Sequence, residues 1–477
     1  MKLIDFLNTD KDLPIDGVTS DSRQVKDNYL FAALQGSKAN GAAYIEDAIH
    51  HGARIILASE GVNLPKDAED VVIINDNNPR QAFAKIAAKF YKLQPKHIVA
   101  VTGTSGKTST VSFVQQLWHL SGITKCASLG TLGLRGPGLK RYGSLTTPDT
   151  ESLHAELADL ASVGIDHLAM EASSHGLDQF RLDGVKISAA AYTNLSRDHL
   201  DYHKDMDHYF AAKARLFSEV MQKNGTAVIN ADDEYADRLI KICEDAGHKV
   251  ITFGMKGKDI TLTNRVPKPD GQDITFSVSG KSYDITLPLV GEFQVMNALC
   301  ALGLVLSQDN DPAKFIPLLE QLRGVPGRLQ LVPGHKKGAV YVDYAHKPAA
   351  LEAILKTLRP HTEGKLVCVF GCGGNRDPGK RPIMGKIAGD LADKVIVTDD
   401  NPRYEDAATI RAAIMEAVPT ATEIGDRAKA IETAVAELGE GDVLVVAGKG
   451  HEQGQIVAET VHIFDDVEEV KKAIAKQ

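Results

Sequence analysis

The sequence predicts an α/β protein of three domains with a mostly parallel central sheet, a small antiparallel extension and a Rossmann-like C-terminal domain. Three observations support this fold class. Its 477 residues suggest about three domains. Apolar runs of strand length alternate with helical patterns in most of the chain. From about residue 252 to 290 the pattern changes to period two with Gly and Pro turns, which is typical of antiparallel strands.

Composition narrows the class of protein. Hydrophobic residues make up 43% and charged residues 25%, as expected of a packed globular protein. The formal net charge of −9 argues against a general nucleic-acid binder but is compatible with a local basic cleft for small anions. The five cysteines are scattered and form no CxxC, so neither a disulfide framework nor a zinc site is indicated.

The chain shows no sign of export or membrane insertion. Residues 1–10 are too short and too acidic for a signal peptide. No run of about 18 uninterrupted apolar residues occurs, so no membrane span is expected. We therefore expect a cytoplasmic protein, and we take it to be a monomer.

Residues 1–95 are predicted to form a small α/β domain. A largely polar turn is expected at Gly17–Arg23, and its residues Ser20 to Arg23 read more simply as turn and capping residues than as ligand contacts. The further elements expected are strands at 29–34, 53–58 and 71–74 and helices at 43–51 and 79–91.

Residues 96–328 form the predicted central domain, which opens with a phosphate-binding loop. The apolar run 98–102 ends in Gly103-Thr-Ser-Gly-Lys-Thr108, and a helical pattern runs from Thr110 to Leu120. Glycines let backbone N–H groups approach phosphate oxygens, and a helix N-terminus adds partial positive charge. Lys107 can reach the outer phosphates and the Thr108 hydroxyl can bind Mg²⁺, although Val101 replaces the usual first glycine.

Polar residues follow the next predicted strands. The buried strand 166–172 carries Glu171 near its end, where a Mg²⁺ ligand would lie; the alternative is a solvated acid. Leu145-Thr-Thr-Pro-Asp149 is either a helix start with Asp149 in the first turn or a binder of carboxylate or phosphate. Ser173–Arg181 is predicted to be a polar loop rich in hydrogen-bond donors.

A second acidic and imidazole cluster follows the strand 189–194. It comprises Asp198, His199, Asp201 and His203, and His199 can be a neutral nitrogen ligand to a second metal. The helix at 209–217 carries Lys213 among apolar and small residues. From the residues alone, Lys213 reads as a lysine that extends from a surface helix into water.

Residues 329–477 alternate strands and helices again, which predicts a second doubly wound unit. Strands are expected at 339–343, 365–370, 394–398 and 442–447, after the loop Gly324–Arg328. Polar loops follow these strands at 343–346, 371–377, 399–403 and 448–452. Because ligands lie beyond the C-terminal ends of such strands, the four loops predict a second ligand site.

These motifs together resemble the Mur ligase family, which builds the peptide of bacterial cell-wall precursors. The resemblance covers nearly the whole chain. It is carried by Gly103–Thr108, Asn194–His203, the Tyr209–Phe217 pattern Y-x-x-A-K-x-x-L-F, and Asp343-Tyr-Ala-His-Lys-Pro348.

The resemblance implies an ATP and Mg²⁺ site. It assigns catalytic roles to Lys107, Lys213, His199, Glu171 and His346. The ATP contacts it implies are Gly103, Thr104, Ser105, Gly106, Lys107, Thr108, Ser109, Asn297, Arg328 and Asp343. It also implies that Lys213 is carbamylated (N6-carboxylysine) and binds Mg²⁺ together with Thr108, Glu171 and His199. Carbamylation turns a cation into an anion, which suits a site between metals and phosphates.

The resemblance further implies a UDP-muramoyl-dipeptide site and an amino-acid site. The first would comprise Ser22, Gln35, Thr146, Thr147, Ser173, Gln179 and Arg181. The second would comprise Arg376, Asp400, Asn401, Pro402, Arg403, Gly448 and Glu452. Asp400–Arg403 matches family members that add meso-diaminopimelate, whose extra carboxylate a buried Arg403 would bind with Arg376 nearby.

The implied activity is ATP-dependent addition of meso-diaminopimelate to UDP-MurNAc-L-Ala-D-Glu through an acyl phosphate. Two alternatives within the family are addition of lysine and folate polyglutamate ligation. An alternative of another class is a non-catalytic ATP-binding switch or scaffold, which would not need the His199–Lys213 set or the amino-acid site.

Overall fold

The computed structural model describes residues 13–36, 40–66, 68, 70–141, 143 and 145–477. The residues on which the signal-peptide argument depends lie outside this range, as do 37–39 near Gln35. The chain divides into two compact units, which are described separately: Met1–Lys258 with Cys300–Asp311, and Asp259–Leu299 with Pro312–Gln477. In the described residues no helix is long and apolar enough to cross a membrane.

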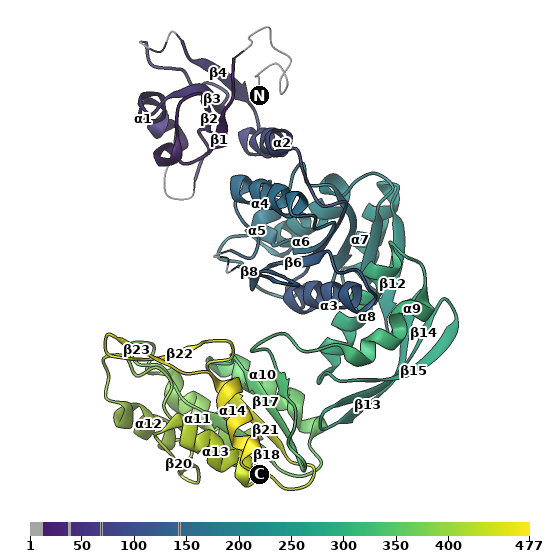
Figure 1. The fold of residues 1–477 in the computed structure, drawn as a ribbon, viewed down its shortest axis with the longest axis vertical. Coiled ribbons are helices and arrows are strands. Elements are labelled where there is room, and N and C mark those ends of the chain that lie inside the picture. The colour runs from purple at the N-terminus through teal and green to yellow at the C-terminus, as the bar shows by residue number, and fades with distance from the viewer. Residues whose placement is uncertain (1–12, 37–39, 67, 69, 142, 144) are drawn as a thin grey trace. The chain divides into compact units, whose positions relative to one another are not determined.

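The first unit contains two mostly parallel sheets (Figure 1). The N-terminal elements are β1 (Gly17–Thr19), β2 (Tyr29–Ala32), β3 (Ala53–Ser59), β4 (Val72–Asp76), the 3-10 turns η2 (Ser22–Gln24) and η3 (Gly41–Tyr44), α1 (Ile45–His50) and α2 (Pro79–Tyr91). The elements that follow are β5 (His97–Thr102), α3 (Lys107–Leu120), β6 (Cys126–Gly130), β7 (Gly133–Gly136), β8 (Leu139–Arg141), α4 (Thr150–Ser162), β9 (His167–Glu171), α5 (Ser174–Asp178), β10 (Ile187–Tyr192), α6 (Met206–Arg215), the π turn η4 (Leu216–Val220), β11 (Thr226–Asn230), α7 (Ala236–Asp245) and β12 (Lys249–Gly254).

The second unit begins with antiparallel strands and continues with an α/β sheet. Its elements are β13 (Ile260–Lys268), β14 (Gly271–Val278), β15 (Lys281–Leu287), α9 (Pro312–Phe315), η5 (Ile316–Gln321), β16 (Gln330–Val332), β17 (Ala339–Asp343), α10 (Pro348–Leu358), η6 (Arg359–His361), β18 (Leu366–Phe370), α11 (Lys380–Leu391), β19 (Lys394–Val397), α12 (Ala407–Met415), β20 (Thr422–Glu423), α13 (Arg427–Ala436), β21 (Val443–Ala447), β22 (Gly454–Val457), β23 (Thr460–Ile463) and α14 (Asp466–Ala475). Helix α8 (Glu292–Leu306) has residues in both units.

The N-terminal sheet has four parallel strands in the order β1-β2-β3-β4. Alternating side chains of its strands pack on opposite faces: Leu30 faces α2 and Phe31 faces α1. The prediction of a polar turn at 17–23 is wrong for Gly17–Thr19, which form the fully buried strand β1. Burial between β2 and α2 outweighs the weak strand preference of a segment this short and polar.

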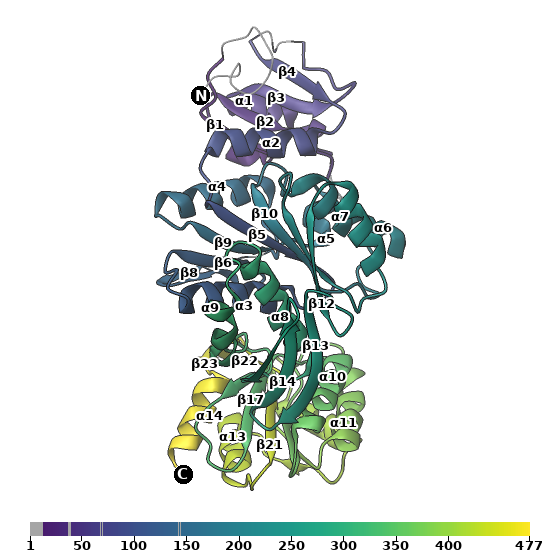
Figure 2. The ribbon, with the colours of Figure 1, turned by 90° about the vertical axis from the view of Figure 1, so that its right-hand side faces the viewer.

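The central sheet places β5 between β9 and β10, as Figure 2 shows. Its order within this unit is β12-β11-β10-β5-β9-β6-β7-β8, and the strands from β12 to β6 are parallel. Parallel pairing brings the C-terminal ends of the strands to one edge, because Val101 pairs with Glu171 and Thr102 with Tyr192. The strands β7 and β8, which continue antiparallel from β6, were not predicted.

The C-terminal sheet has the order β16-β17-β21-β18-β19-β20, and all its pairings are parallel except that of β16 with β17. Helices cover both faces. Val340 and Val342 of β17 belong to the core beneath α13 and α14, whereas Tyr341 belongs to the core beneath α10 and α11. The predicted α/β class is confirmed, including the antiparallel strands β13–β15 and the four predicted strands of this last segment.

Candidate active site

The glycine-rich loop between β5 and α3 has a backbone that only glycine adopts without strain at two positions. Gly103 has φ 148° and Gly106 has φ 89°. A Cβ at Gly103 would lie 1.9 Å from the hydroxyl of Thr193, so this position also has no room for a side chain. Helix α3 begins at Lys107, three residues earlier than the pattern from Thr110 indicated, which places Thr108 in its first turn.

The end of β10 fixes this loop. The N–H of Thr104 donates to the carbonyl of Asn194 at 2.9 Å, and the N–H of Ser105 donates to the Asn194 side chain at 3.0 Å. The Thr193 hydroxyl donates to the carbonyl of Ser105 at 2.6 Å. These contacts hold the loop in its curved form, which orients the N-terminus of α3 toward any bound anion.

A half-buried lysine, Lys107, and a buried one, Lys213, meet at the carbonyl oxygen of Gly103. The Nζ atoms of Lys107 and Lys213 each donate to it at 2.8 Å, and Lys107 also donates to the carbonyl of Thr104 at 2.9 Å. Burial lowers the pKa of Lys107, and burial together with the charge of Lys107 lowers the pKa of Lys213 well below its usual value. The prediction that Lys213 extends into water is wrong, because it is only 1% exposed and its ammonium lies 4.4 Å from the ring of Tyr209.

Glu171 ends β9 as a buried carboxylate, so the alternative of a solvated acid is wrong. It is 1% exposed, and it accepts hydrogen bonds from the N–H of Thr131 at 2.8 Å and from the Thr131 hydroxyl at 3.2 Å. Burial raises its pKa, while the Thr131 contacts, Lys107 and the Thr108 hydroxyl favour the ionised form. A Cβ at Gly130 would lie 2.1 Å from Glu171 Oε1, so glycine is required beside this carboxylate.

The residues expected to hold the dipeptide form one hydrogen-bonded network. The Thr147 hydroxyl donates to the carbonyl of Glu171 at 2.9 Å and accepts from the N–H of Ser173 at 3.0 Å. Arg181 donates to the carbonyl of Thr147 at 2.7 Å. Two more of its nitrogens donate to Gln179 Oε1, at 3.2 and 2.7 Å. The segment predicted as a polar loop contains the short helix α5, with Ser173 as its N-cap.

Thr146 and Asp149 complete this region. The hydroxyls of Thr146 and Thr131 lie 3.1 Å apart, so Thr146 is linked to Glu171 through Thr131. Asp149 is the N-cap of α4, one residue before the first turn in which it was expected, and its carboxylate accepts from the N–H of Ser152. The structure thus brings the predicted dipeptide residues of this region next to the predicted metal ligand.

His199 lies on a tight turn at the rim of the same region. Its φ is 52°, its side chain is 44% exposed, and its Nε2 lies 3.6 Å from Asp198 Oδ2. Its ring centroid is 5.0 Å from that of His175, a residue that the sequence analysis did not select. The one feature of the sequence that could have indicated His175 is its position shortly after Glu171, just beyond the end of a predicted strand. His203 is buried, and among the residues that the structure describes its Nε2 has no hydrogen-bond partner.

No group of three or more His, Cys, Asp or Glu side chains in the described part of the chain is arranged to hold a metal ion. The predicted metal ligands are instead the Thr108 hydroxyl, Glu171, His199 and a carbamylated Lys213. The Thr108 hydroxyl is close enough to favour the ionised form of Glu171 and so to lower its pKa, and the resemblance assigns these two residues to one ion.

The second unit has a cavity of about 610 Å³ at the C-terminal edge of its sheet. Most of the predicted amino-acid contacts line it: Arg376, Asp400, Asn401, Arg403, Gly448 and Glu452. Other lining residues, which sequence reasoning did not select, include Tyr344, Lys347, Asp377, Lys380 and Ile383. His346 lines this cavity too, with its Nδ1 2.9 Å from the carbonyl of Tyr344.

Arg403 is half-buried, not buried as expected. Its Nη1 donates to the carbonyl of Gly374 at 3.0 Å, and its backbone has φ 52°. The backbone N–H of Arg403 donates to the carbonyl of Ile456 at 3.0 Å, so the hairpin β22–β23 supports this loop from one side. The remaining guanidinium nitrogens keep donors that a ligand carboxylate can use.

Three residues predicted to contact ATP belong to the second unit. Asn297 is buried in α8, where its side chain donates to Gln294 Oε1 at 3.1 Å, whereas Arg328 is exposed. The Asp343 carboxylate accepts from the backbone N–H groups of Leu329 and Ala345 at 2.7 and 2.8 Å. Burial raises the pKa of Asp343. This carboxylate therefore fixes the loop that carries His346.

The two residues predicted to contact uridine lie in the N-terminal sheet region. Ser22 is buried and begins η2, which Asp21 caps, while Gln35 is exposed and its carbonyl accepts a short hydrogen bond from Arg80. The structure places them on separate loops of the same small sheet.

Three family models match the chain. The model described as "Mur ligase family, catalytic domain" matches residues 14–91, "Mur ligase middle domain" matches 101–305, and "Mur ligase, glutamate ligase domain" matches 327–450.

Curated proteins and solved structures resemble the chain over nearly its full length. Proteins named UDP-N-acetylmuramoyl-L-alanyl-D-glutamate–2,6-diaminopimelate ligase are 52% identical in Chelativorans sp. (97% of this chain, 95% of that protein) and 50% identical in Agrobacterium fabrum (97% and 94%). A solved structure with the same name is 35% identical, with a TM-score of 0.78 over 97% of this chain and 95% of that one. The folylpolyglutamate synthase of Mycobacterium tuberculosis shares the fold at 21% identity, with a TM-score of 0.57 over 77% and 92%.

Replacing Lys213 with Met should change how stability depends on pH. Because the folded protein lowers the pKa of Lys213 below 10.5, the unfolded chain binds more protons between the two values. The free-energy cost of burying this ammonium is therefore fully present below the folded-state pKa. It falls to zero as the pH rises toward 10.5. We expect K213M to unfold about 2–4 °C above the wild type at neutral pH in buffer free of carbon dioxide, with the gap narrowing at higher pH.

The measurement is thermal unfolding from pH 6 to 10, with exposed Lys223→Met as the matched control. A gap between K213M and the wild type that stays constant over this range would contradict the lowered pKa.

Proposed function

The chain belongs to the Mur ligase family, and we propose that it is an ATP-dependent ligase that joins meso-2,6-diaminopimelate to the D-glutamate of UDP-MurNAc-L-Ala-D-Glu in peptidoglycan precursor synthesis. The observation that carries this proposal is the cavity lined by Arg376, Arg403, Asp400 and Glu452. The lining carries two guanidinium groups and three carboxylates, Asp377 being the third, so it offers partners to both the carboxylates and the ammonium groups of diaminopimelate. Relatives that are about 50% identical over 97% of the chain have the corresponding name.

The preference for diaminopimelate over lysine depends on the end of the ligand that lies away from the reacting amine. Diaminopimelate differs from lysine by one carboxylate, for which a guanidinium offers two parallel donors. Asp400 and Glu452 are assigned to the neighbouring ammonium. Lysine would leave the half-buried Arg403 without that carboxylate partner, so the charged hydrogen bonds that favour diaminopimelate would be lost.

The carboxylate substrate is assigned to the network around Glu171. Thr146, Thr147, Ser173, Gln179 and Arg181 would hold the dipeptide, and Ser22 and Gln35 the uridine group. The support is that the first five form one connected set of donors beside Glu171. A rigid set of this kind orients a flexible peptide before reaction.

The phosphates of ATP are assigned to the loop from Gly103 to Ser109. Asn297, expected near adenine, and Arg328 and Asp343 stay predicted ATP contacts. The loop fits them, because its two glycines have left-handed φ values and Lys107 is already turned toward the loop carbonyls. A phosphate oxygen offers the Lys107 ammonium a stronger, charged acceptor than these carbonyls. The buried Glu171 carboxylate, with the Thr108 hydroxyl near it, suits a hard cation.

We assign Mg²⁺ to Thr108 and Glu171 and a second ion to His199 and carbamylated Lys213. When bound, Mg²⁺ offsets the negative charge of the transferred phosphoryl group. The support for carbamylation is that Lys213 is buried with a lowered pKa, because the neutral amine is the form that attacks CO₂. The product is an anion, which removes the repulsion between Lys107 and Lys213.

The reaction proceeds in two steps. The D-glutamyl carboxylate attacks the γ-phosphorus of ATP, which releases ADP and leaves an acyl phosphate, while Lys107 offsets charge on the phosphoryl oxygens. The free amine of diaminopimelate then attacks the acyl carbon, an amide bond forms, and phosphate and a proton are released. His346 lines the amino-acid cavity, so we assign it to the incoming amino acid rather than to the nucleotide.

The alternatives fit the molecule less well. A lysine ligase would not need Arg403 at its cavity, and a folate ligase would not need the dipeptide network. A non-catalytic ATP-binding scaffold would need neither the buried Lys213 nor the amino-acid cavity. A cytoplasmic monomer remains our prediction for localisation and oligomeric state.

Phosphate release tests the reaction directly. With ATP, Mg²⁺, UDP-MurNAc-L-Ala-D-Glu and meso-diaminopimelate, we expect release that depends on every component, because the amine completes the turnover. With L-lysine in place of diaminopimelate, kcat/KM should fall by about 100-fold or more. Equal rates with lysine would refute the assigned amino acid, and release that needs neither peptide nor amine would favour a simple ATPase.

Electron density tests the modification of Lys213. In a crystal of the complex with nucleotide and Mg²⁺, grown in bicarbonate buffer, density for a carboxylate on Nζ is expected at Lys213 and not at Lys107. An unmodified Lys213 in that complex would contradict the assignment.

Replacing Arg403 with Ala should weaken diaminopimelate binding most. The loss of a charged hydrogen bond of about 2–3 kcal/mol corresponds to a rise of about 30- to 150-fold in the KM for diaminopimelate. The KM values for ATP and the UDP-dipeptide should stay within about twofold. The matched control is Arg359→Ala, which removes a surface arginine paired with Asp393. A uniform rise in all three KM values would contradict the assigned contact.

A further inference from the structure

Directly behind the amino-acid cavity lies a lysine that no step of the proposed reaction uses. Lys449 follows β21 in the sequence Gly448-Lys-Gly-His-Glu452 and is 0% exposed. Its Nζ donates to Asn401 Oδ1 at 2.9 Å and to Glu452 Oε2 at 3.4 Å. Asn401 and Glu452 line the cavity, whereas Lys449 is not among its lining residues.

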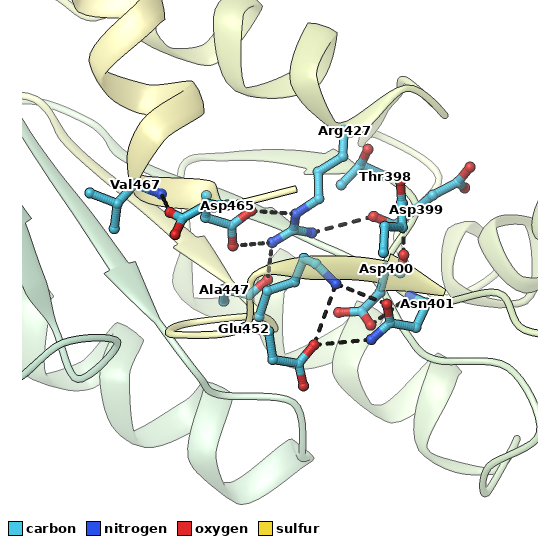
Figure 3. Close-up of polar contacts among 12 residues, drawn as sticks. Thr398, Asp399, Asp400, Asn401, Arg427, Ala447, Glu452, Asp465 and Val467 are labelled. Carbon is cyan, nitrogen blue, oxygen red and sulfur yellow. Dashed lines mark hydrogen bonds and ion pairs between the residues drawn. The ribbon is translucent and has the colours of Figure 1, made fainter. Parts of the chain in front are cut away.

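The ammonium of Lys449 decides the orientation of the Asn401 amide. A lysine can only donate, so the amide must present its oxygen to Lys449. The same oxygen accepts from the backbone N–H of Ile456 at 2.9 Å. The NH₂ group of Asn401 is thereby directed the other way, where it donates to Glu452 Oε2 at 3.1 Å (Figure 3). A reversed amide would place its NH₂ against two donors.

The same ammonium also holds the Glu452 carboxylate. Lys449 and Asn401 both contact Oε2, so Oε1 is the oxygen left for a ligand ammonium. A carboxylate that two donors already hold loses less conformational entropy on ligand binding than a free glutamate side chain does. Lys449 thus presets both the position of Glu452 and the face that it presents to the cavity.

A second buried cation anchors the strands on either side. Arg427 pairs through two nitrogens with Asp466, both at 2.7 Å, and neither side chain is exposed. It also donates to the carbonyls of Ala447 at 3.0 Å and Asp399 at 3.4 Å (Figure 3). These contacts tie the end of β21 and the loop after β19 to one support, and Lys449 and Asn401 follow directly after these two points.

We propose that Lys449 is a positioning residue for the amino-acid substrate, which sets the affinity for diaminopimelate by orienting the amide of Asn401 and the carboxylate of Glu452. The proposal rests on the proposed function, since it names a group that acts on the same cavity. Lys449 acts through its two neighbours and does not contact the substrate. Its removal should weaken binding of the amino acid and leave the ATP and dipeptide sites unchanged.

The test is steady-state kinetics of the full chain with Lys449→Met, which keeps the length of the side chain and removes its charge and donors. We expect the KM for diaminopimelate to rise at least tenfold, with the KM values for ATP and UDP-dipeptide and kcat within about threefold. Lys429→Met, which removes an exposed lysine paired with Glu432, is the matched control and should behave as the wild type.

A double-mutant cycle with Glu452→Gln identifies the route of the effect. If Lys449 acts through Glu452, K449M should cost much less in the E452Q background than in the wild type. Full additivity, or a wild-type KM for diaminopimelate in K449M, overturns the proposal while the function stands. A wild-type enzyme that does not use diaminopimelate overturns the proposed function itself.

Folding is checked by thermal unfolding and by the KM for the UDP-dipeptide. If K449M does not fold, Lys449→Gln, whose side chain is polar but shorter and uncharged, takes its place in the same measurements. Failure of both variants to fold would show that Lys449 holds the domain together and would overturn a specific role in substrate binding.

Discussion

Parallel strand pairing is the constraint on which the rest of this structure depends. In the first unit, the register that aligns Val101 with Glu171 and Thr102 with Tyr192 brings three strand ends to one level. The phosphate loop, the buried carboxylate and the Asn194 turn meet there for that reason. In the second unit, β17, β21, β18 and β19 bring four loops to one edge in the same way.

The two sites manage buried charge differently. In the first unit, Lys107 and Lys213 share one neutral acceptor, the carbonyl of Gly103, and both have lowered pKa values. Under the proposed function, the phosphates of ATP would give these ammonium groups charged acceptors in addition to the nearby Glu171 carboxylate. In the second unit, Arg427 has Asp466 as a partner, and Lys449 has Glu452. Both of these cations already have a carboxylate partner, and a zwitterionic ligand would add no net charge beside them.

Sequence reasoning succeeded where local pattern and final environment agree. The strand 339–343, the helix 79–91 and the position of Glu171 at a strand end follow from apolar periodicity and were found as expected. It failed where tertiary packing decides. Gly17–Thr19 look like part of a turn and form a strand only because β2 and α2 cover them.

Side-chain environment was the less predictable property. Lys213 looks like a surface lysine on its helix, and only the approach of the phosphate loop shows that it is buried. Arg403 was expected to be buried but is half-buried among the residues that line its cavity. Lys449 gave no periodic or motif signal of its role, because that role depends on Asn401, 48 residues away in the chain.

The sequence by itself determined the α/β class, the phosphate loop and the family, because apolar periodicity and short motifs are local properties of a chain. Tertiary structure alone decided which charges are buried, which amide is held in which orientation, and which loops share a cavity. These properties depend on groups that are far apart in the sequence, and their energies arise only when folding excludes water from between them.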